Sequence, residues 1–136
     1  MANILNTARR RSFLAILGVG DNFVSRRISN WLDSSKFVAD ATNGQKEVWP
    51  GLVVAQNTST YKWVPYNVSA SYGPGSDGVN SKLGVMDTFE DVTWGDQAIA
   101  PVFHGKVIER HCYVFGQPLD SITSAVKTAL PDIEWL

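Results

Sequence analysis

The stretch Gly51-Leu52-Val53-Val54-Ala55-Gln56-Asn57-Thr58 indicates the fold class most directly, because a short apolar run lies between turn-forming residues. The four apolar residues from Leu52 to Ala55 follow Pro50-Gly51, a pattern typical of a buried strand entered through a turn. The next segment, residues 60–66, is rich in the aromatic and β-branched residues that strands prefer. Together they predict two successive β-strands.

More short apolar segments with strand character follow along the chain, at residues 82–86, 98–103, 105–108 and 111–115. Pro65 and Pro101 lack a backbone N–H, so we expect them at strand edges or bulges. Six or seven short strands at this spacing predict a mainly β fold with a small barrel or sandwich-like body.

The C-terminal region has the spacing of an amphipathic helix, with a cap at Asp120 or Ser121 and a stop at Pro131. Its apolar positions are Ile122, Ala125, Val126, Ala129 and Leu130. The apolar chain end that follows, with Trp135 and Leu136, is expected either to fill the core or to contact a neighbouring chain.

A second helix is predicted near the N-terminus, from Asp21 or Asn22 to about Asp33. Its apolar face, with Arg26 and Arg27 mostly on the other side, comprises Val24, Ile28, Trp31 and Leu32. We interpret residues 1–46 as an extended basic arm containing this short helix. Residues 47–136 are interpreted as the β-rich body with the C-terminal helix.

Composition indicates contact with other protein chains. Charged residues make up only 18% of the 136 residues, and aromatic residues make up 11%. Because few charged side chains cover the surface, some of the large apolar side chains are expected to contact other chains. Residues 1–50 hold seven basic and four acidic residues, and residues 51–136 hold five basic and nine acidic ones. The net charge of −1 gives no electrostatic reason to expect binding to nucleic acid or to an anionic membrane.

The motifs that would carry catalysis or metal binding have structural explanations. The segment 73–78 matches G-x-G-x-x-G, but no helix pattern follows it, so a surface loop is expected. His104, His111 and the lone Cys112 do not supply a convincing zinc site. The acidic residues of 87–96 are interpreted as a solvated connection. We therefore expect no enzyme activity, no cofactor and no metal.

The N-terminal segment Arg10-Arg11-Ser12-Phe13-Leu14 matches a twin-arginine export signal, but the apolar run after it is short. No stretch approaches the length of a membrane span. We therefore interpret this segment as an arm that becomes ordered because it packs on something.

The body resembles the head decoration (capsid cement) proteins of lambda-like tailed phages over residues 51–136. The resemblance lies in the run 51–58, in Tyr61-Lys62-Trp63-Val64-Pro65-Tyr66, and in Leu83-Gly84-Val85-Met86 after the polar loop 73–78. It continues through Glu90-Asp91-Val92 and Gly95-Asp96 to the apolar segment 98–103, Gly105-Lys106-Val107 and a late helix. It implies a small β-rich protein that assembles as trimers on the outer capsid surface of the virion, with an N-terminal arm that contacts the major capsid protein.

The candidate binding residues follow from this resemblance and from the charge distribution. The basic arm is expected to bind the capsid through Arg9, Arg10, Arg11, Phe13, Leu14, Arg26, Arg27 and Trp31. The homotrimer interface is expected to contain Trp63, Tyr66, Trp94 and Trp135.

An alternative is another virion or tail structural component, with a glycan-binding β-barrel. Sugars would then stack on four aromatic residues of the body, Tyr61, Trp63, Tyr66 and Tyr72.

Overall fold

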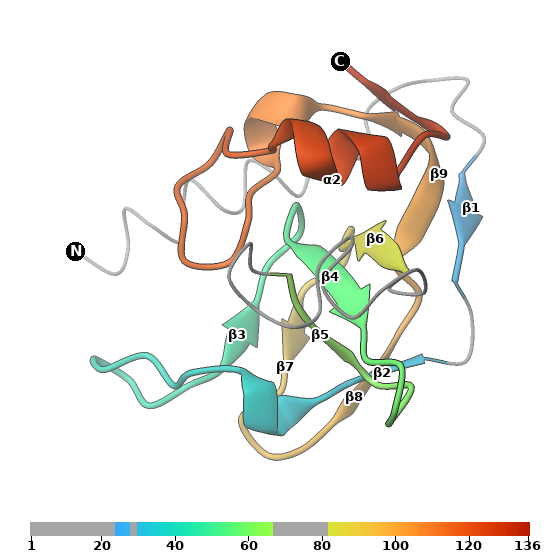
Figure 1. Ribbon diagram of the computed structural model, residues 1–136. Helices are drawn as coiled ribbons and strands as arrows, with labels where there is room; N and C mark the ends of the chain where they lie inside the picture. The colour runs from blue at the N-terminus through green and yellow to red at the C-terminus, as the bar shows by residue number, and fades with distance from the viewer. Residues whose placement is uncertain (1–23, 28–29, 67–81) are drawn as a thin grey trace.

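The computed structural model describes residues 24–27, 30–66 and 82–136, and most of its strands form one curled β-sheet (Figure 1). The path through this sheet is β1-β9-β6-β4-β5-β2-β8, and β10 pairs in parallel with β9. These strands are β1 (Ser25–Arg26), β2 (Asn30–Leu32), β4 (Val53–Gln56), β5 (Trp63–Pro65), β6 (Leu83–Val85), β8 (Gln97–Ile99), β9 (Val102–Val107) and β10 (Ile133–Trp135). A separate pair joins β3 (Glu47–Val48) to β7 (Glu90–Asp91). The prediction of a mainly β fold is confirmed.

The strand predicted at residues 52–55 is the central strand β4, and both of its faces are covered. Val53 and Ala55 belong to one core cluster, while Leu52 and Val54 belong to a second cluster. Successive side chains of a strand point to opposite faces, so a strand between two cores needs apolar residues at every position. This arrangement explains why the run has no polar alternation.

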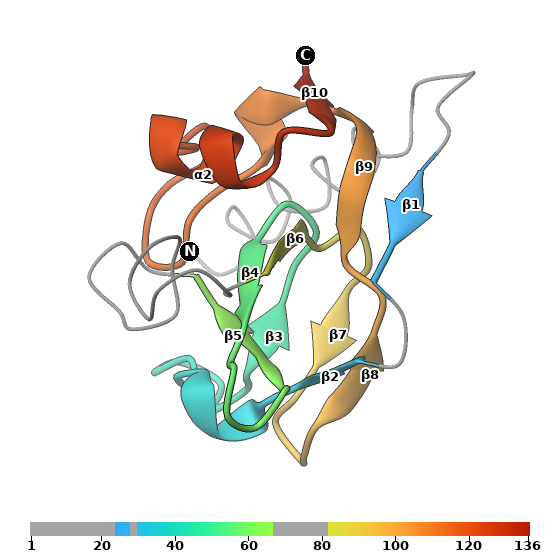
Figure 2. The same cartoon turned by 45° about the vertical axis from the view of Figure 1, so that its right-hand side comes forward.

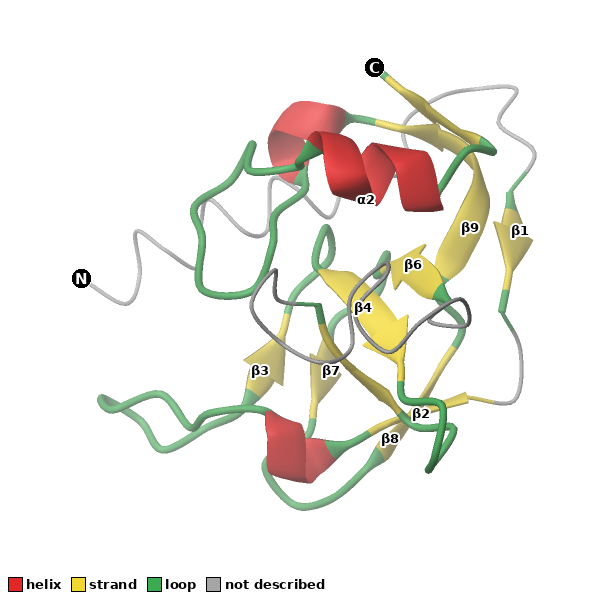
Figure 3. Cartoon of the chain, viewed as in Figure 1, coloured by secondary structure: helices red, strands yellow, loops and turns green. Residues whose placement is uncertain are grey.

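The C-terminal helix predicted from the sequence is present as α2 (Ser124–Ala129), which lies at the same end of the molecule as β10 (Figures 1 and 3). Its N-cap is Thr123, whose hydroxyl accepts from the N–H of Val126, rather than Asp120 or Ser121. Asp120 instead has a left-handed backbone conformation with φ of 64°. Val126 and Leu130 are buried in the first core cluster together with Ile133 of β10.

The helix predicted over residues 21–33 is wrong across its described part, because residues 25–26 and 30–32 are strands. Helical spacing would put Trp31 and Leu32 on one face. In the structure Trp31 is 52% exposed and Leu32 is fully buried, as expected when neighbouring residues of a strand alternate. Leu32 lies opposite Trp63 of β5 and Gln97 of β8. Pairing with strands distant in sequence therefore overrides the local helical pattern.

The proposed division after residue 46 stays a prediction. Leu32 and Phe37, which precede it, are buried in the second core cluster with Val54 and Trp63 of the body. The segment from β2 onward is thus built into the same core as the residues that follow position 46.

The segment 98–103 is split by a bend at Ala100 and Pro101 into β8 and β9. Figure 2 shows β9 leading down to β8, with β1 and β2 beside them. The bend brings Pro101 against β6, where a Cβ atom on Gly84 would lie only 2.6 Å from the Pro101 Cβ. Glycine at position 84 therefore allows the corner of the curled sheet to pack.

The strand predicted at residues 111–115 is also wrong. The chain forms a 3-10 helix η2 (Glu109–His111), and only Tyr113 makes an isolated bridge, to Leu52. The N–H of Tyr113 donates to the carbonyl of Gly51, which binds this segment to the start of β4 without a continuous ladder.

Candidate functional site

The part of the predicted arm that the structure describes is held to the body by an ion pair. Two nitrogens of the Arg26 guanidinium contact the two carboxylate oxygens of Asp87, at 2.6 and 2.5 Å. Asp87 is only 3% exposed, although the sequence predicted a solvated acidic segment there. The hydrogen bond to Asp87 raises the pKa of Arg26. Such a bidentate pair fixes both the position and the orientation of β1.

Arg27 is likewise held within the chain. Its backbone N–H donates to the carbonyl of Pro101 at 2.9 Å, and its guanidinium lies 4.2 Å from the centre of the Phe103 ring. Burial lowers the pKa of Arg27. Arg26 and Arg27, two of the five arginines expected to bind the capsid, therefore make contacts inside the protein. Of the remaining arm candidates, Trp31 is 52% exposed on β2, and five lie outside the described residues: Arg9, Arg10, Arg11, Phe13 and Leu14.

The four aromatic residues expected at the trimer interface have very different environments. Trp63 is fully buried and Tyr66 is 3% exposed, so both side chains belong to the protein's own core. Trp135 is half-buried and packs against the first core cluster. Trp94 is 92% exposed. Of these four, Trp94 therefore offers by far the most apolar surface to a partner.

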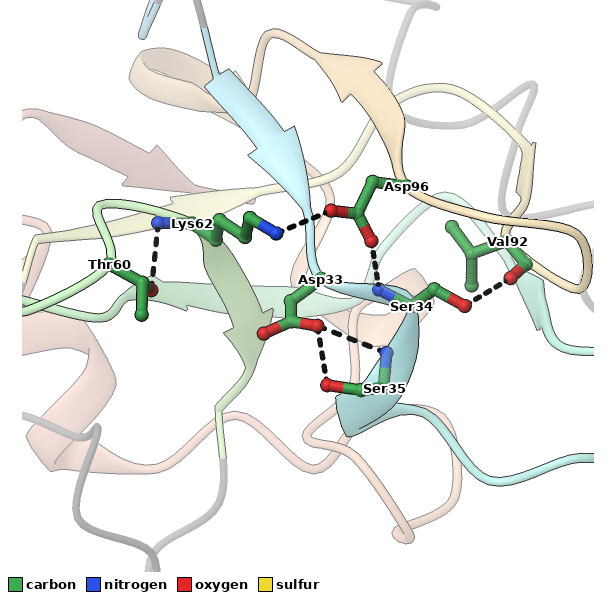
Figure 4. Close-up of polar contacts among 7 residues, drawn as sticks. All are labelled: Asp33, Ser34, Ser35, Thr60, Lys62, Val92 and Asp96. Carbon is green, nitrogen blue, oxygen red and sulfur yellow. Dashed lines mark hydrogen bonds and ion pairs between the residues drawn. The ribbon is translucent and has the colours of Figure 1, made fainter.

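One bonded network joins three segments of the chain, each of which carries an exposed aromatic residue (Figure 4 shows the network). In this network the Lys62 ammonium pairs with Asp96 at 2.8 Å, and Asp96 also accepts from the N–H of Ser34 at 2.8 Å. Trp31, Tyr61 and Trp94 are each within three residues of a member of the network, and they are 52%, 70% and 92% exposed. Composition indicated exposed aromatic surface, and the network brings these three segments to one end of the molecule.

The turn that carries Trp94 is held on both sides by hydrogen bonds. The Asp91 carboxylate accepts from the N–H and the hydroxyl of Thr93, and these bonds lower the pKa of Asp91. The Thr93 hydroxyl in turn accepts from the N–H of Lys46, whose carbonyl accepts from the N–H of Val92. The exposed indole therefore stands on a fixed turn.

The surface has a pocket of about 300 Å³. Its described lining residues are Phe37, Glu47, Leu52, Tyr113, Phe115, Gly116 and Gln117. Phe37 and Phe115 meet edge to face, with ring centres 6.0 Å apart. These residues come from three distant segments and share no sequence motif, which is why sequence reasoning missed the pocket.

The titratable groups that the sequence raised as catalytic or metal candidates are scattered. His104 is exposed on β9, whereas His111 is partly buried in η2, where burial lowers its pKa. Within 24–27, 30–66 and 82–136, the residues His, Cys, Asp and Glu form no group of three that could hold a metal ion. Among the same residues no helix has the length and apolar character needed to cross a membrane.

The chain matches no protein-family model, no curated protein and no solved structure.

Proposed function

We propose that this protein is a non-enzymatic capsid decoration protein of a tailed phage. It binds the outer surface of the expanded head as a homotrimer, and its partners are the major capsid protein and its own copies. The proposal starts from the resemblance of residues 51–136 to cement proteins. It is supported by the mainly β fold, which is the class that the resemblance implies.

The observation that carries the proposal is the anchoring of β1 by Arg26 and Asp87. The basic residues Arg9 to Arg11 precede this strand, so the basic segment is connected to the sheet at a point fixed by an ion pair with a buried carboxylate. A clamp needs such a rigid attachment, because force on a bound arm must reach the folded body. The net positive charge of residues 1–50 suits an acidic groove on the shell.

Stabilisation of the shell then follows from binding equilibrium. A protein that binds the expanded shell but not its precursor stabilises the expanded form by mass action. A trimer engages three equivalent sites at once, so three weak arm contacts combine into tight attachment.

The alternative function, glycan binding by a tail or virion component, has less structural support. Two of its four aromatic candidates, Trp63 and Tyr66, are buried, and Tyr72 lies outside the described residues. Of the three candidates that the structure describes, Tyr61 alone is exposed, at 70%.

The experiment is co-sedimentation of the protein with purified expanded and unexpanded shells. We expect the full chain to bind expanded shells only. A chain lacking residues 1–20, and a full-length chain with Arg9→Ala, Arg10→Ala and Arg11→Ala, should keep the circular dichroism spectrum of the folded body and lose binding. The triple substitution is the matched control for chain length.

Two results would count against the proposal. A folded full chain that does not bind expanded shells overturns the decoration function, and hits on a glycan array would then favour the alternative. A truncated chain that decorates shells as well as the full chain shows that the arm is not the binding element.

A further inference from the structure

The pocket of about 300 Å³ combines a carboxylate with aromatic walls. Phe37 and Phe115 meet with their ring planes at 88°, so the two rings form a corner rather than a stack. Glu47 and Gln117 add side-chain oxygens to the lining. Gly116 and Gln117 are exposed, so the pocket opens to solvent. Its volume is at the lower end of the range for pockets that take small ligands.

The Glu47 carboxylate keeps both charge and hydrogen-bonding capacity. Its Oε2 accepts from the indole N–H of Trp49 at 3.1 Å, which uses one of the about four acceptor sites of a carboxylate. Among the residues that the structure describes, Glu47 forms no ion pair, and the ammonium of Lys46 donates to the carbonyl of Ser34 at 3.0 Å instead. Asp91 lies opposite Glu47 in the β3–β7 pair. Like charges on facing strands repel, so a cation at Glu47 would relieve this repulsion.

We propose that this pocket is a binding site for a guanidinium group. A guanidinium is a flat, weakly hydrated cation with several N–H donors, so it can lie against an aromatic ring while it donates to a carboxylate. An ammonium is more strongly hydrated and cannot lie flat on a ring. A metal ion would need more oxygen ligands than the single carboxylate of the described lining offers.

The natural ligand is then an arginine side chain, and the chain itself has a source of it. Arg9, Arg10 and Arg11 are three consecutive basic residues near the N-terminus. An arginine of another protein would bring the same chemistry. The site itself rests on the pocket and on Glu47, and it does not depend on the proposed function.

The test is an NMR titration of the full chain with ethylguanidinium, followed by the indole N–H of Trp49 and the backbone N–H of Gln117. We expect both resonances to shift and to saturate with a dissociation constant of about 1 mM, an ordinary value for a ligand of this size. N-ethylurea has a similar flat shape without the charge. It should bind at least about tenfold more weakly.

Three variants test the assigned contacts, with the circular dichroism spectrum as a check on folding. Glu47→Gln keeps an oxygen for Trp49 but removes the charge, so the dissociation constant read from Gln117 should rise by about tenfold. Phe115→Leu keeps an apolar wall without the ring and should raise it by about threefold. Glu134→Gln removes an exposed carboxylate of β10 that does not line the pocket, and should leave it unchanged.

The same titration identifies the source of the natural ligand when it is repeated on a full chain with Arg9→Ala, Arg10→Ala and Arg11→Ala. If the chain's own arginines occupy the pocket, this variant should bind ethylguanidinium several-fold more tightly, because a competitor of high effective concentration is gone. Equal affinities would assign the natural ligand to another protein.

The inference is overturned if neither the unaltered chain nor the triple variant shows a saturable shift up to about 50 mM ethylguanidinium. It is also overturned if N-ethylurea binds equally well, or if Glu47→Gln and Glu134→Gln have the same affinity. Shell co-sedimentation is measured without the ligand, so failure of the guanidinium site is distinguishable from failure of the decoration function.

Discussion

Arg26 and Asp87 are 61 positions apart in the sequence, and their side chains form a bidentate ion pair that holds strand β1 at the edge of the sheet. The burial of the pair is unequal, since the Arg26 side chain is 36% exposed and that of Asp87 only 4%. Loss of Arg26 should therefore destabilise the protein more than loss of Asp87. The reason is that the Asp87 carboxylate, left alone, is less hydrated than the Arg26 guanidinium would be.

We predict that Arg26→Met lowers the free energy of unfolding by about 3 kcal/mol, since it leaves the Asp87 carboxylate buried without its cation. Asp87→Asn should lower the free energy of unfolding by less, about 1 to 2 kcal/mol, because the Arg26 guanidinium left without its partner still reaches water. Urea unfolding of both single variants and of the double variant measures this. Equal losses for the two single variants would contradict the unequal hydration of the pair.

Gly51 is predicted to be the least replaceable glycine of the described chain. Its φ is +97°, and a Cβ atom there would lie 2.2 Å from the carbonyl oxygen of His111. Because backbone rather than a flexible side chain blocks the space, Gly51→Ala should cost more than about 3 kcal/mol or prevent folding. Thermal unfolding followed by circular dichroism tests this.

Gly44 provides the matched control for this prediction. Its φ is also positive, at +69°, but a Cβ atom there has no neighbour within 4 Å. Gly44→Ala should therefore cost only the backbone strain, about 1 kcal/mol. If the two variants were equally stable, the close approach of residue 51 to His111 would not be a constraint on folding.

The free energy of unfolding is predicted to fall in acid, partly because Asp96 and Asp91 become protonated. Hydrogen bonds from Lys62 and from the N–H of Ser34 lower the pKa of Asp96, and bonds from Thr93 lower that of Asp91. Their stabilisation is fully present above the ordinary aspartate pKa of about 3.9 and is lost as the pH falls through the lower folded-state values. Asp96→Asn should be less stable than the unaltered chain at neutral pH and lose less stability below about pH 4.

The urea midpoint measured from neutral pH downward checks this prediction. Asp132→Asn, a change at an exposed carboxylate, serves as the control and should follow the unaltered chain. A steep acid loss that persists unchanged in Asp96→Asn and Asp91→Asn would show that these two carboxylates are not its source.

The Cys112 thiol is predicted to be unreactive toward thiol reagents in the folded protein. It is fully buried in the first core cluster, and burial raises the pKa of its thiol to about 12. The thiolate is the reactive form, so a thiol-specific reagent at about pH 8 should label the protein only as it unfolds. Labelling in denaturing urea is the positive control, and rapid labelling under native conditions would contradict the buried environment.

The local sequence was sufficient where a segment's own pattern matched its final environment. The apolar run from Leu52 to Ala55 has no alternation, and it became a strand with a core cluster on each face. The spacing of Val126 and Leu130 likewise predicted a helix that packs on the body. In both cases neighbouring residues carry the information.

The candidate surface was only partly predictable. Composition indicated exposed aromatic residues, but it could not distinguish the buried Trp63 from the exposed Trp94. The pocket joins Phe37 to Leu52 and Phe115, and its existence depends on how these distant segments pack.

The sequence by itself determined the mainly β class, the central strand and the C-terminal helix, because strand and helix periodicities act over a few residues. Only the tertiary structure decided that residues 25–26 and 30–32 are strands, although Val24, Trp31 and Leu32 have helical spacing. The physical reason is that Leu32 gains a buried place opposite Trp63, and Arg26 gains the buried carboxylate of Asp87. Contacts between residues so far apart in the chain leave no trace in the local pattern.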